Sequence, residues 1–240
     1  MAIPISGLIG YYPFNGNAND ESLTGNHGTA VNATLTADRY GDPDSAYYFN
    51  GVDAYIDLLS GFGGPTSGTV AAWVTVESYD LGYNMLNLIV GQADNFQLGL
   101  GDTSTGSDGL WVARLRAPGG FANAVGPSPD PLPTDWVHVA TVWTGAELIL
   151  YIDGMEESRV PPGTLTGAAG SMTFGMFAGK DYWHGNIDDV VIYDRALEPS
   201  EILELMAPEE PPPIPEPGTL ALLGLGLAAI VRRRGWRWRH

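Results

Sequence analysis

The chain contains 240 residues, of which 32 are Gly, 18 are Pro and none is Cys. This share of Gly and Pro exceeds what a helical bundle tolerates, and a hydrophobic content of 44% is too high for a disordered chain. The lack of Cys excludes disulfide scaffolds, thiolate zinc sites and cysteine nucleophiles. The first 207 residues hold 25 acidic and only six basic side chains. Nucleic-acid binding is built on Lys and Arg, so this acidic body makes nucleic acid a poor partner and suits hard cations such as calcium better.

Short apolar runs separated by turn residues fill the chain as far as residue 207. They are rich in Val, Ile, Tyr, Trp and Thr, which predicts β-strands. The predicted strands are residues 8–14, 46–50, 69–77, 85–91, 96–100, 110–116, 136–144, 147–153, 171–178 and 187–193. Both alternating faces of 136–143 are mostly apolar, which is typical of a strand covered on both sides. We therefore expect 136–153 to form a hairpin at the centre of two stacked sheets.

One helix is predicted in this body, over residues 199–206. Pro199 suits the first helical turn, and Ile202, Leu203 and Met206 form an apolar stripe. The sequence thus predicts an all-β, two-sheet antiparallel sandwich with one short terminal helix.

The composition changes after Ala207. Residues 208–214 form a Pro-rich spacer, and an uninterrupted apolar stretch, 218–231, precedes a basic end. As a helix this stretch would be about 21 Å long, short for a comfortable span but able to insert with local thinning. We expect a C-terminal hydrophobic anchor helix with its arginines in the cytoplasm and the body outside. The alternative is a loosely packed amphiphilic end or an ordinary C-terminal helix.

Four segments of the body together carry a family resemblance. They are residues 10–20 (GYYPFNGNAND), 46–56 (AYYFNGVDAYI), 136–140 with 150–154 (WVHVA and LYIDG), and 185–197 (GNIDDVVIYDRAL). In this order, across residues 7–207, they resemble the laminin-G-like domains of the concanavalin A-like lectin/glucanase superfamily. The resemblance implies a two-sheet jelly roll of antiparallel strands, in agreement with the strand prediction.

The tail, residues 215–240, resembles a PEP-CTERM sorting signal. The matching residues are Pro215, Glu216 and Pro217, followed by the apolar stretch and by Arg232, Arg233 and Arg234. The resemblance implies recognition by an exosortase in the inner membrane of a Gram-negative bacterium, transient anchoring there, and delivery to the cell surface or extracellular matrix. Residues 1–6 lack the basic region and apolar core of a signal peptide, so we expect a truncated or misassigned start.

Calcium is the cofactor that the sequence favours, in a structural role. Hard cations bind carboxylate, amide and carbonyl oxygens, and Asp20, Asn50 and Asp53 lie in loops that offer them. Related folds hold a calcium ion where an Asp of the last strand meets the N-terminal loops, and Asp188 matches that position best. The alternative is that these side chains accept hydrogen bonds from turn amides.

The family's commonest activity is carbohydrate binding, in which aromatic rings stack on sugar faces. Trp183 and Tyr182, just before the last predicted strand, are the leading candidates because a loop would present them. Further candidates are Tyr79, Tyr83, Trp111 and Phe121, whereas Trp73, Trp136 and Trp143 are expected in the core.

Catalysis is not expected. Glucanases of this fold need acidic residues at alternate strand positions, and no such run occurs; Asp188 and Asp189 are adjacent and should face opposite ways. Serine-hydrolase, zinc-protease and Walker motifs are missing from the sequence, and His138 is expected to be a hydrogen-bonded core residue.

The sequence therefore predicts a non-enzymatic, exported module that binds a glycan or exopolysaccharide matrix. A structural or adhesive matrix protein without sugar binding is the alternative, and a glycoside hydrolase the remote one.

Overall fold

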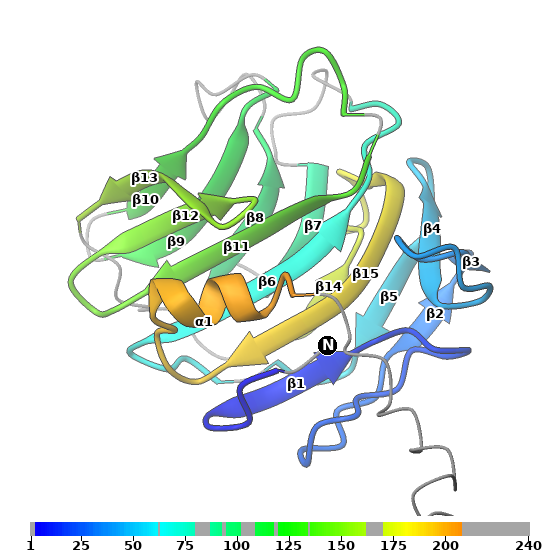
Figure 1. Cartoon of the computed structure of the whole chain (residues 1–240), viewed down its shortest axis with the longest axis horizontal. Coiled ribbons are helices and arrows are strands. Elements are labelled where there is room, and N and C mark those ends of the chain that lie inside the picture. The colour runs from blue at the N-terminus through cyan, green and yellow to red at the C-terminus, as the bar shows by residue number, and fades with distance from the viewer. Residues whose placement is uncertain are drawn as a thin grey trace, which may run out of the picture. The chain divides into compact units, whose positions relative to one another are not determined.

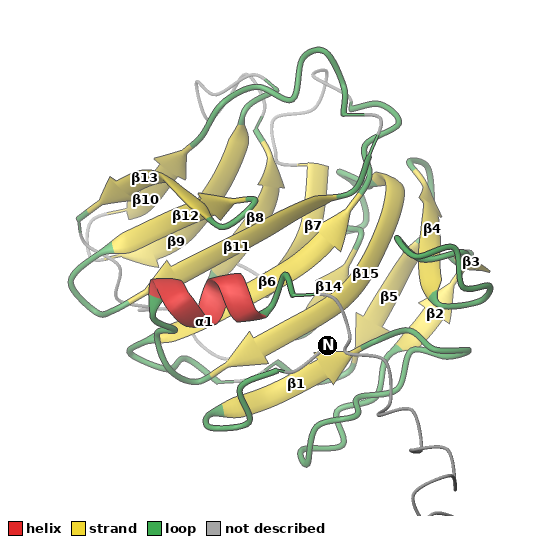
Figure 2. Ribbon diagram, viewed as in Figure 1, coloured by secondary structure: helices red, strands yellow, loops and turns green. Residues whose placement is uncertain are grey.

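The long strands place every second side chain in one apolar layer between two antiparallel sheets (Figures 1 and 2). The computed structural model describes residues 3–61, 63–79, 87–92, 95–101, 109–117, 120–133, 135–161 and 170–207. The body, Ala2–Ala207, is one unit, and the second unit, Pro208–His240 with Met1, lies outside the described residues. The structure therefore does not test the predicted spacer, sorting signal and anchor helix. Within the described ranges, no helix has the length and apolar character needed to cross a membrane.

The first sheet has the strand order β13-β12-β11-β6-β15-β4-β3, and β1 also pairs with β15. All pairings in it are antiparallel. Its strands are β1 (Leu8–Tyr12), β3 (Thr34–Thr36), β4 (Ala46–Asn50), β6 (Gly68–Val74), β11 (Val137–Trp143), β12 (Leu148–Ile152), β13 (Met155–Val160) and β15 (His184–Tyr193).

The second sheet has the order β10-β9-β8-β7-β14-β5-β2, again with antiparallel neighbours throughout. Its strands are β2 (Thr29–Val31), β5 (Tyr55–Leu58), β7 (Asn87–Gln92), β8 (Phe96–Leu100), β9 (Trp111–Ala117), β10 (Gly120–Val125) and β14 (Met172–Phe174).

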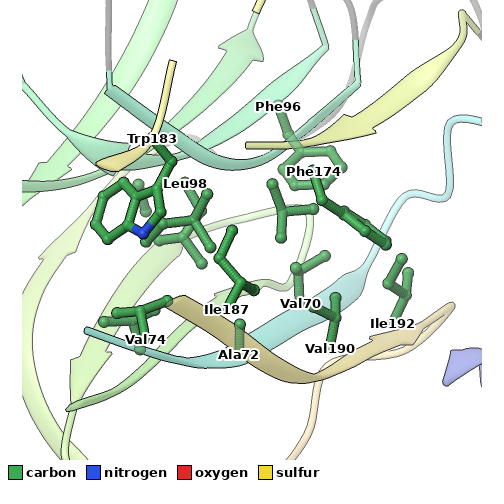
Figure 3. Packing of buried hydrophobic residues seen from close by; sticks show 14 of the residues in the cluster. Val70, Ala72, Val74, Phe96, Leu98, Phe174, Trp183, Ile187, Val190 and Ile192 are labelled. Carbon is green, nitrogen blue, oxygen red and sulfur yellow. The ribbon is translucent and has the colours of Figure 1, made fainter. Parts of the chain in front are cut away.

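The core fills the space between the sheets with branched and aromatic side chains (Figure 3). Val70, Ala72 and Val74 of β6 face Leu98 of β8 and Phe174 of β14 across this layer. Each fully buried Val, Leu or Phe side chain contributes roughly 1.5–3 kcal/mol of transfer free energy. A small cavity at one end of the layer, beside Trp143 and Tyr193, has room for about one water molecule and is too small for a sugar.

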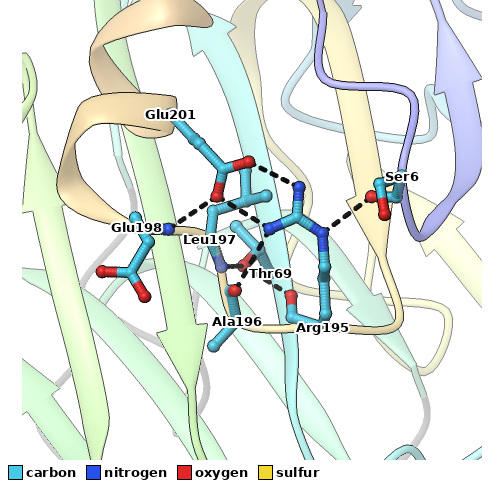
Figure 4. A network of polar contacts seen from close by, with 7 residues as sticks. All are labelled: Ser6, Thr69, Arg195, Ala196, Leu197, Glu198 and Glu201. Atoms are coloured by element: carbon cyan, nitrogen blue, oxygen red, sulfur yellow. Dashed lines mark hydrogen bonds and ion pairs between the residues drawn. The ribbon is translucent and has the colours of Figure 1, made fainter.

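The single described helix, α1 (Pro199–Glu204), lies on the outer face of the first sheet (Figure 1). Arg195 fixes it: both terminal guanidinium nitrogens donate to the Glu201 carboxylate, at 2.7 and 2.6 Å, and Nε donates to the Ser6 carbonyl (Figure 4). The Glu201 carboxylate also accepts from the backbone N–H of Glu198, which caps the first turn. The Thr69 hydroxyl of β6 joins Arg195 and Leu197 to the sheet.

These observations confirm the predicted two-sheet antiparallel sandwich with one short terminal helix. Each predicted strand overlaps an observed one, and all seven residues of β11 are buried, as expected for a doubly covered strand. The hairpin of β11 and β12 exists, but β6 takes the central position of the sheet, so the predicted central hairpin is wrong in that detail. Five strands were not predicted, namely β2, β3, β5, β10 and β13. β2, β3 and β5 have only three or four residues, and β13 carries few apolar side chains.

Candidate functional site

A row of polar side chains crosses the outer face of the second sheet. Gln97 of β8 pairs in register with Arg114 of β9, and Arg114 pairs with Asn123 of β10. Two residues further along β9, Arg116 lies opposite Phe121 of β10. The residues that alternate with them, such as Leu98, Ala113 and Ala124, belong to the core, so these five side chains project from the opposite face. We call them the arginine face: Gln97, Arg114, Arg116, Phe121 and Asn123.

Phe121 holds the two arginines of this face close together. The guanidinium carbon of Arg114 lies 4.2 Å from the centre of the Phe121 ring, and that of Arg116 lies 4.9 Å from it. The two charged groups are therefore at most about 9 Å apart, within the roughly 10 Å over which charges interact at 0.1 M salt. Three other arginines of the body pair with carboxylates, namely Arg39, Arg159 and Arg195. Arg116 has no carboxylate partner among the residues that the structure describes.

The same face contains polar atoms that accept no hydrogen bond within the described part of the chain. They are Oε1 of Gln97, a residue only 3% exposed, and Oδ1 of Asn123. A buried acceptor without a donor costs about 1–3 kcal/mol.

The predicted sugar-binding aromatics divide into core and surface residues. Trp183 is 1% exposed and points into the layer between the sheets, so the prediction that a loop presents it at the surface is wrong (Figure 3). The buried Trp111 packs against it, with ring centres 6.4 Å apart. Tyr79 packs against the core, and Tyr83 lies outside the described residues. Phe121 and Tyr182 remain partly exposed.

Tyr182 lies away from the arginine face, in the loop before β15. Burial and the nearby Tyr55 and Asp53 raise its pKa, which places it beside the turn between β4 and β5. The structure thus brings Tyr182 close to Asp53 but does not group it with Phe121.

Asp20, the first predicted calcium ligand, is fully hydrogen-bonded by the loop that contains it and by β1. Its carboxylate accepts hydrogen bonds from the backbone N–H groups of Tyr11, Ser22 and Asn26 and from the Thr24 hydroxyl, at 2.7–3.0 Å. Burial of the side chain opposes ionisation, yet these bonds together lower the pKa of Asp20. Both oxygens are therefore occupied by the protein.

Asn50 and Asp53 close the tight turn between β4 and β5. Oδ1 of Asn50 accepts from the backbone N–H groups of Val52, Asp53 and Ala54, at 3.0–3.1 Å, and Nδ2 of Asn50 donates to Asp53 Oδ1 at 2.8 Å. Asn32 donates to the other carboxylate oxygen of Asp53 at 3.0 Å. This is the turn-amide alternative that the sequence left open for both residues.

Asp188 lies on β15 and pairs with an arginine that the sequence did not single out. Arg39 places Nη1 3.0 Å from Oδ2 of Asp188 and 2.6 Å from Oδ2 of Asp189. The adjacent aspartates do not face opposite ways as predicted, because a bulge interrupts the strand here and Asp189 has a φ of 44°. The exposed fractions of the three side chains are 7% for Arg39, 2% for Asp188 and 11% for Asp189.

One guanidinium cannot neutralise both carboxylates fully. Burial and the charge of Asp189 raise the pKa of Asp188 to about 8, although Arg39 opposes the shift. The pKa of Asp189 is raised as well, mainly by burial. Arg39 also stacks on Tyr40 and Trp73, with its guanidinium carbon 4.5 and 4.8 Å from the ring centres.

The four predicted ligands therefore do not fit a shared calcium ion. Asp20 and the Asn50–Asp53 pair are engaged in separate turns, and Arg39 supplies the positive charge beside Asp188. Among the described residues, no three His, Asp or Glu side chains converge in a group that could hold a metal ion.

His138 is buried as predicted, at 2% exposure, and packs against Trp73 with ring centres 5.2 Å apart. Burial, with a smaller contribution from the charge of Arg39, lowers its pKa to about 3. Its Nδ1 has no hydrogen-bond partner in the part of the chain that the structure describes, which differs from the expected hydrogen-bonded histidine.

A second polar cluster joins the ends of β4, β6 and β15 at the surface. Nδ1 of His184 lies 2.6 Å from the Ser78 hydroxyl, and Nε2 lies 3.0 Å from Glu77 and 3.1 Å from the Tyr48 hydroxyl. The residue types are those of a hydrolytic triad, but the order is reversed, because in a triad Nε2 faces the serine and Nδ1 the acid. We assign these residues the role of tying strand ends together.

Comparison with known families finds two matches in this chain. Residues 49–203 match the family model described as the concanavalin A-like lectin/glucanases superfamily, and residues 213–235 match the PEP-CTERM protein-sorting motif. No curated protein sequence matches the chain.

Solved structures share the fold at low sequence identity. Domain 4 of AbnA, a GH43 extracellular arabinanase from Geobacillus stearothermophilus solved with arabinotriose, is 23% identical, with a TM-score of 0.66 and coverage of 83% of this chain and 98% of that domain. The binding domain of Paraclostridial Mosquitocidal Protein 1 is 16% identical, with a TM-score of 0.62 and coverage of 84% and 52%. Trypanosoma rangeli sialidase is 17% identical, with a TM-score of 0.59 and coverage of 85% and 33%. These neighbours include binding domains and enzymes alike, and at such identities the likeness establishes the fold alone.

Proposed function

The chain belongs to the concanavalin A-like lectin/glucanase superfamily and carries a PEP-CTERM sorting motif, and on this premise we propose that it is an exported, non-enzymatic carbohydrate-binding module. The motif implies export and surface sorting in a Gram-negative bacterium, with an exosortase as the processing partner. The proposed ligand is a glycan or exopolysaccharide of the surface or matrix in which the module is placed.

The observation that carries this proposal is the arginine face. Sugars are bound through several polar groups that fix hydroxyls and a ring or planar group that packs on the sugar. Gln97, Arg114 and Asn123 form a continuous polar row across three strands, and Phe121 lies beside it with the Arg116 guanidinium. A rigid sheet holds all five side chains, which limits the entropy lost when a ligand binds.

The absence of catalysis is part of the proposal. The adjacent aspartates Asp188 and Asp189 are buried and shared with Arg39, so they are poorly placed to act on a polysaccharide. The predicted calcium ion is left out, because the residues named for it serve other contacts.

A glycan array probed with the full chain tests the proposal. One array is run with millimolar calcium and one with EDTA, and the Asn123→Ala and Phe121→Ala variants follow on the same array. We expect saturable binding to a defined class of glycans, equal in both buffers and weakened by both substitutions. If the folded protein binds no glycan in either buffer, the proposal is wrong and a structural or adhesive matrix protein becomes the better interpretation. Binding that EDTA abolishes would restore a metal site to the function.

A further inference from the structure

We infer that the glycan bound by the arginine face is acidic, carrying a carboxylate or sulfate group that contacts Arg116. The inference rests on the proposed function and adds the chemical class of the ligand. Its starting point is the contrast between this face and the rest of the body, which has 25 acidic and only six basic residues.

In such a chain almost any arginine finds a carboxylate. Arg39 contacts two carboxylates, Arg159 contacts Glu147 and Glu156, and Arg195 binds Glu201 through two nitrogens. Arg116 departs from this pattern within the described residues, since its guanidinium group stacks on the ring of Phe121 and contacts no carboxylate there. Stacking on a ring orients a guanidinium but does not neutralise its charge.

The position of Arg114 strengthens the case. Both guanidinium groups stack on one ring, so two like charges are held at most about 9 Å apart. A guanidinium presents its N–H groups in a planar fork that matches the two oxygens of a carboxylate or sulfate.

The amide side chains beside the arginines further limit the class of ligand that fits this face. The Asn123 side chain is partly exposed on this face, so a saccharide can offer it a hydroxyl group while an anionic group of the same saccharide contacts Arg116. A bare inorganic anion supplies only acceptors and a neutral sugar supplies no charge, whereas an acidic saccharide supplies both.

The negative net charge of the body limits where an acidic glycan can bind. Elsewhere its acidic surface repels an acidic polymer, but charges beyond about 10 Å are largely screened at 0.1 M salt. An acidic glycan is thus held where the arginines lie and kept away from other surfaces, which fixes one binding position.

The test uses the full chain on an array that contains carboxylated, sulfated and neutral glycans, with the R116Q and R116K variants and R159Q as the matched control. Arg159 is also a surface arginine, on β13, but its charge is already shared with two glutamates. We expect binding to acidic glycans, weakened about tenfold by R116Q, less by R116K, and unchanged by R159Q. Urea midpoints of all variants should match the wild type, which separates lost binding from lost folding.

Two outcomes would overturn the inference. Binding to neutral glycans that equals binding to acidic ones, with no effect of R116Q, would leave a lectin but reject the acidic ligand. The absence of binding to every glycan by a folded protein would reject the proposed function as well.

Discussion

Replacing Arg39 by Met removes the only cation that contacts the two buried carboxylates of β15 in the described structure. Asp188 and Asp189 would remain at 2% and 11% exposure without their shared partner. Breaking a buried ion pair by removing one member costs about 3–5 kcal/mol. Lost stacking on Tyr40 and Trp73, with ring distances of 4.5 and 4.8 Å, adds roughly 0.5–1 kcal/mol for each ring. We therefore expect R39M to lose about 4–7 kcal/mol of unfolding free energy at pH 8.

The assay is urea unfolding followed by tryptophan fluorescence at pH 8 and pH 5. The loss should be smaller at pH 5, because protonation of the carboxylates relieves the unpaired charge. R159M is the matched control: its ion pairs with Glu147 and Glu156 are about 40% exposed and should contribute less than about 1 kcal/mol. If R39M does not fold, R39K serves as the test variant. Its unfolding free energy should lie between the value expected for R39M and that of the wild type.

The reasoning is refuted if R39M is no less stable than R159M at pH 8. Calcium provides a second check, because wild-type stability should not change when millimolar calcium is added. A clear rise in the urea midpoint with calcium would mean that the protein binds the ion in its folded state.

Further predictions concern pH, the core and the tail. The pKa values of Asp188 and Asp189 are raised in the folded state, so the folded state binds more protons than the unfolded state between about pH 4 and 8. Their contribution to stability therefore falls as the pH rises through this window. D189N keeps an oxygen for Arg39 and should flatten the dependence of the unfolding free energy on pH, measured by urea unfolding. His138 has the opposite effect on stability, because its pKa is lowered to about 3 in the folded state and the unfolded state takes up a proton first. Stability is therefore lost as the pH falls below about 6.5, and H138F should remove that loss. W183A should cost about 3–5 kcal/mol by opening a core cavity, whereas a cost below 1 kcal/mol would contradict its burial. Deleting residues 218–240 should release the body from membranes on fractionation, and a truncated protein that still sediments with them would reject the anchor.

The fold was largely predictable because it depends on local patterns. Alternating apolar residues identified the core strands, and Pro199 with the stripe after it identified α1. Strands such as β13, with the sequence MEESRV, have little apolar signal, since pairing with β12 holds them in place. Their positions follow from the sheet and not from their own composition.

The contacts of the site residues named from the sequence were less predictable, because several of them join distant parts of the chain. Arg39 and Asp188 are 149 positions apart, and no spacing in the sequence relates them. The bulge at Asp189 reverses the direction expected from strict alternation. Trp183 precedes a strand in a polar segment, which favoured exposure, yet the backbone N–H and C=O of Trp183 bond to Gly175 and Gly51 and the ring turns inward. Phe121 and Tyr182 were expected at the surface, and both are partly exposed in the structure.

The position of β15 would have a mechanical consequence if the proposed sorting tail holds the module by its C-terminal end. A pull on residue 207 first reaches α1, which the Arg195–Glu201 pair and the Thr69 contacts fasten to the sheet. Once the helix peels away, the load passes to a ten-residue strand that is bonded to β6 on one edge and to β1 and β4 on the other. A pull directed along that strand would have to shear several backbone hydrogen bonds at the same time. Under the proposed anchoring, the sandwich would thus be held through a strand that is paired on both edges.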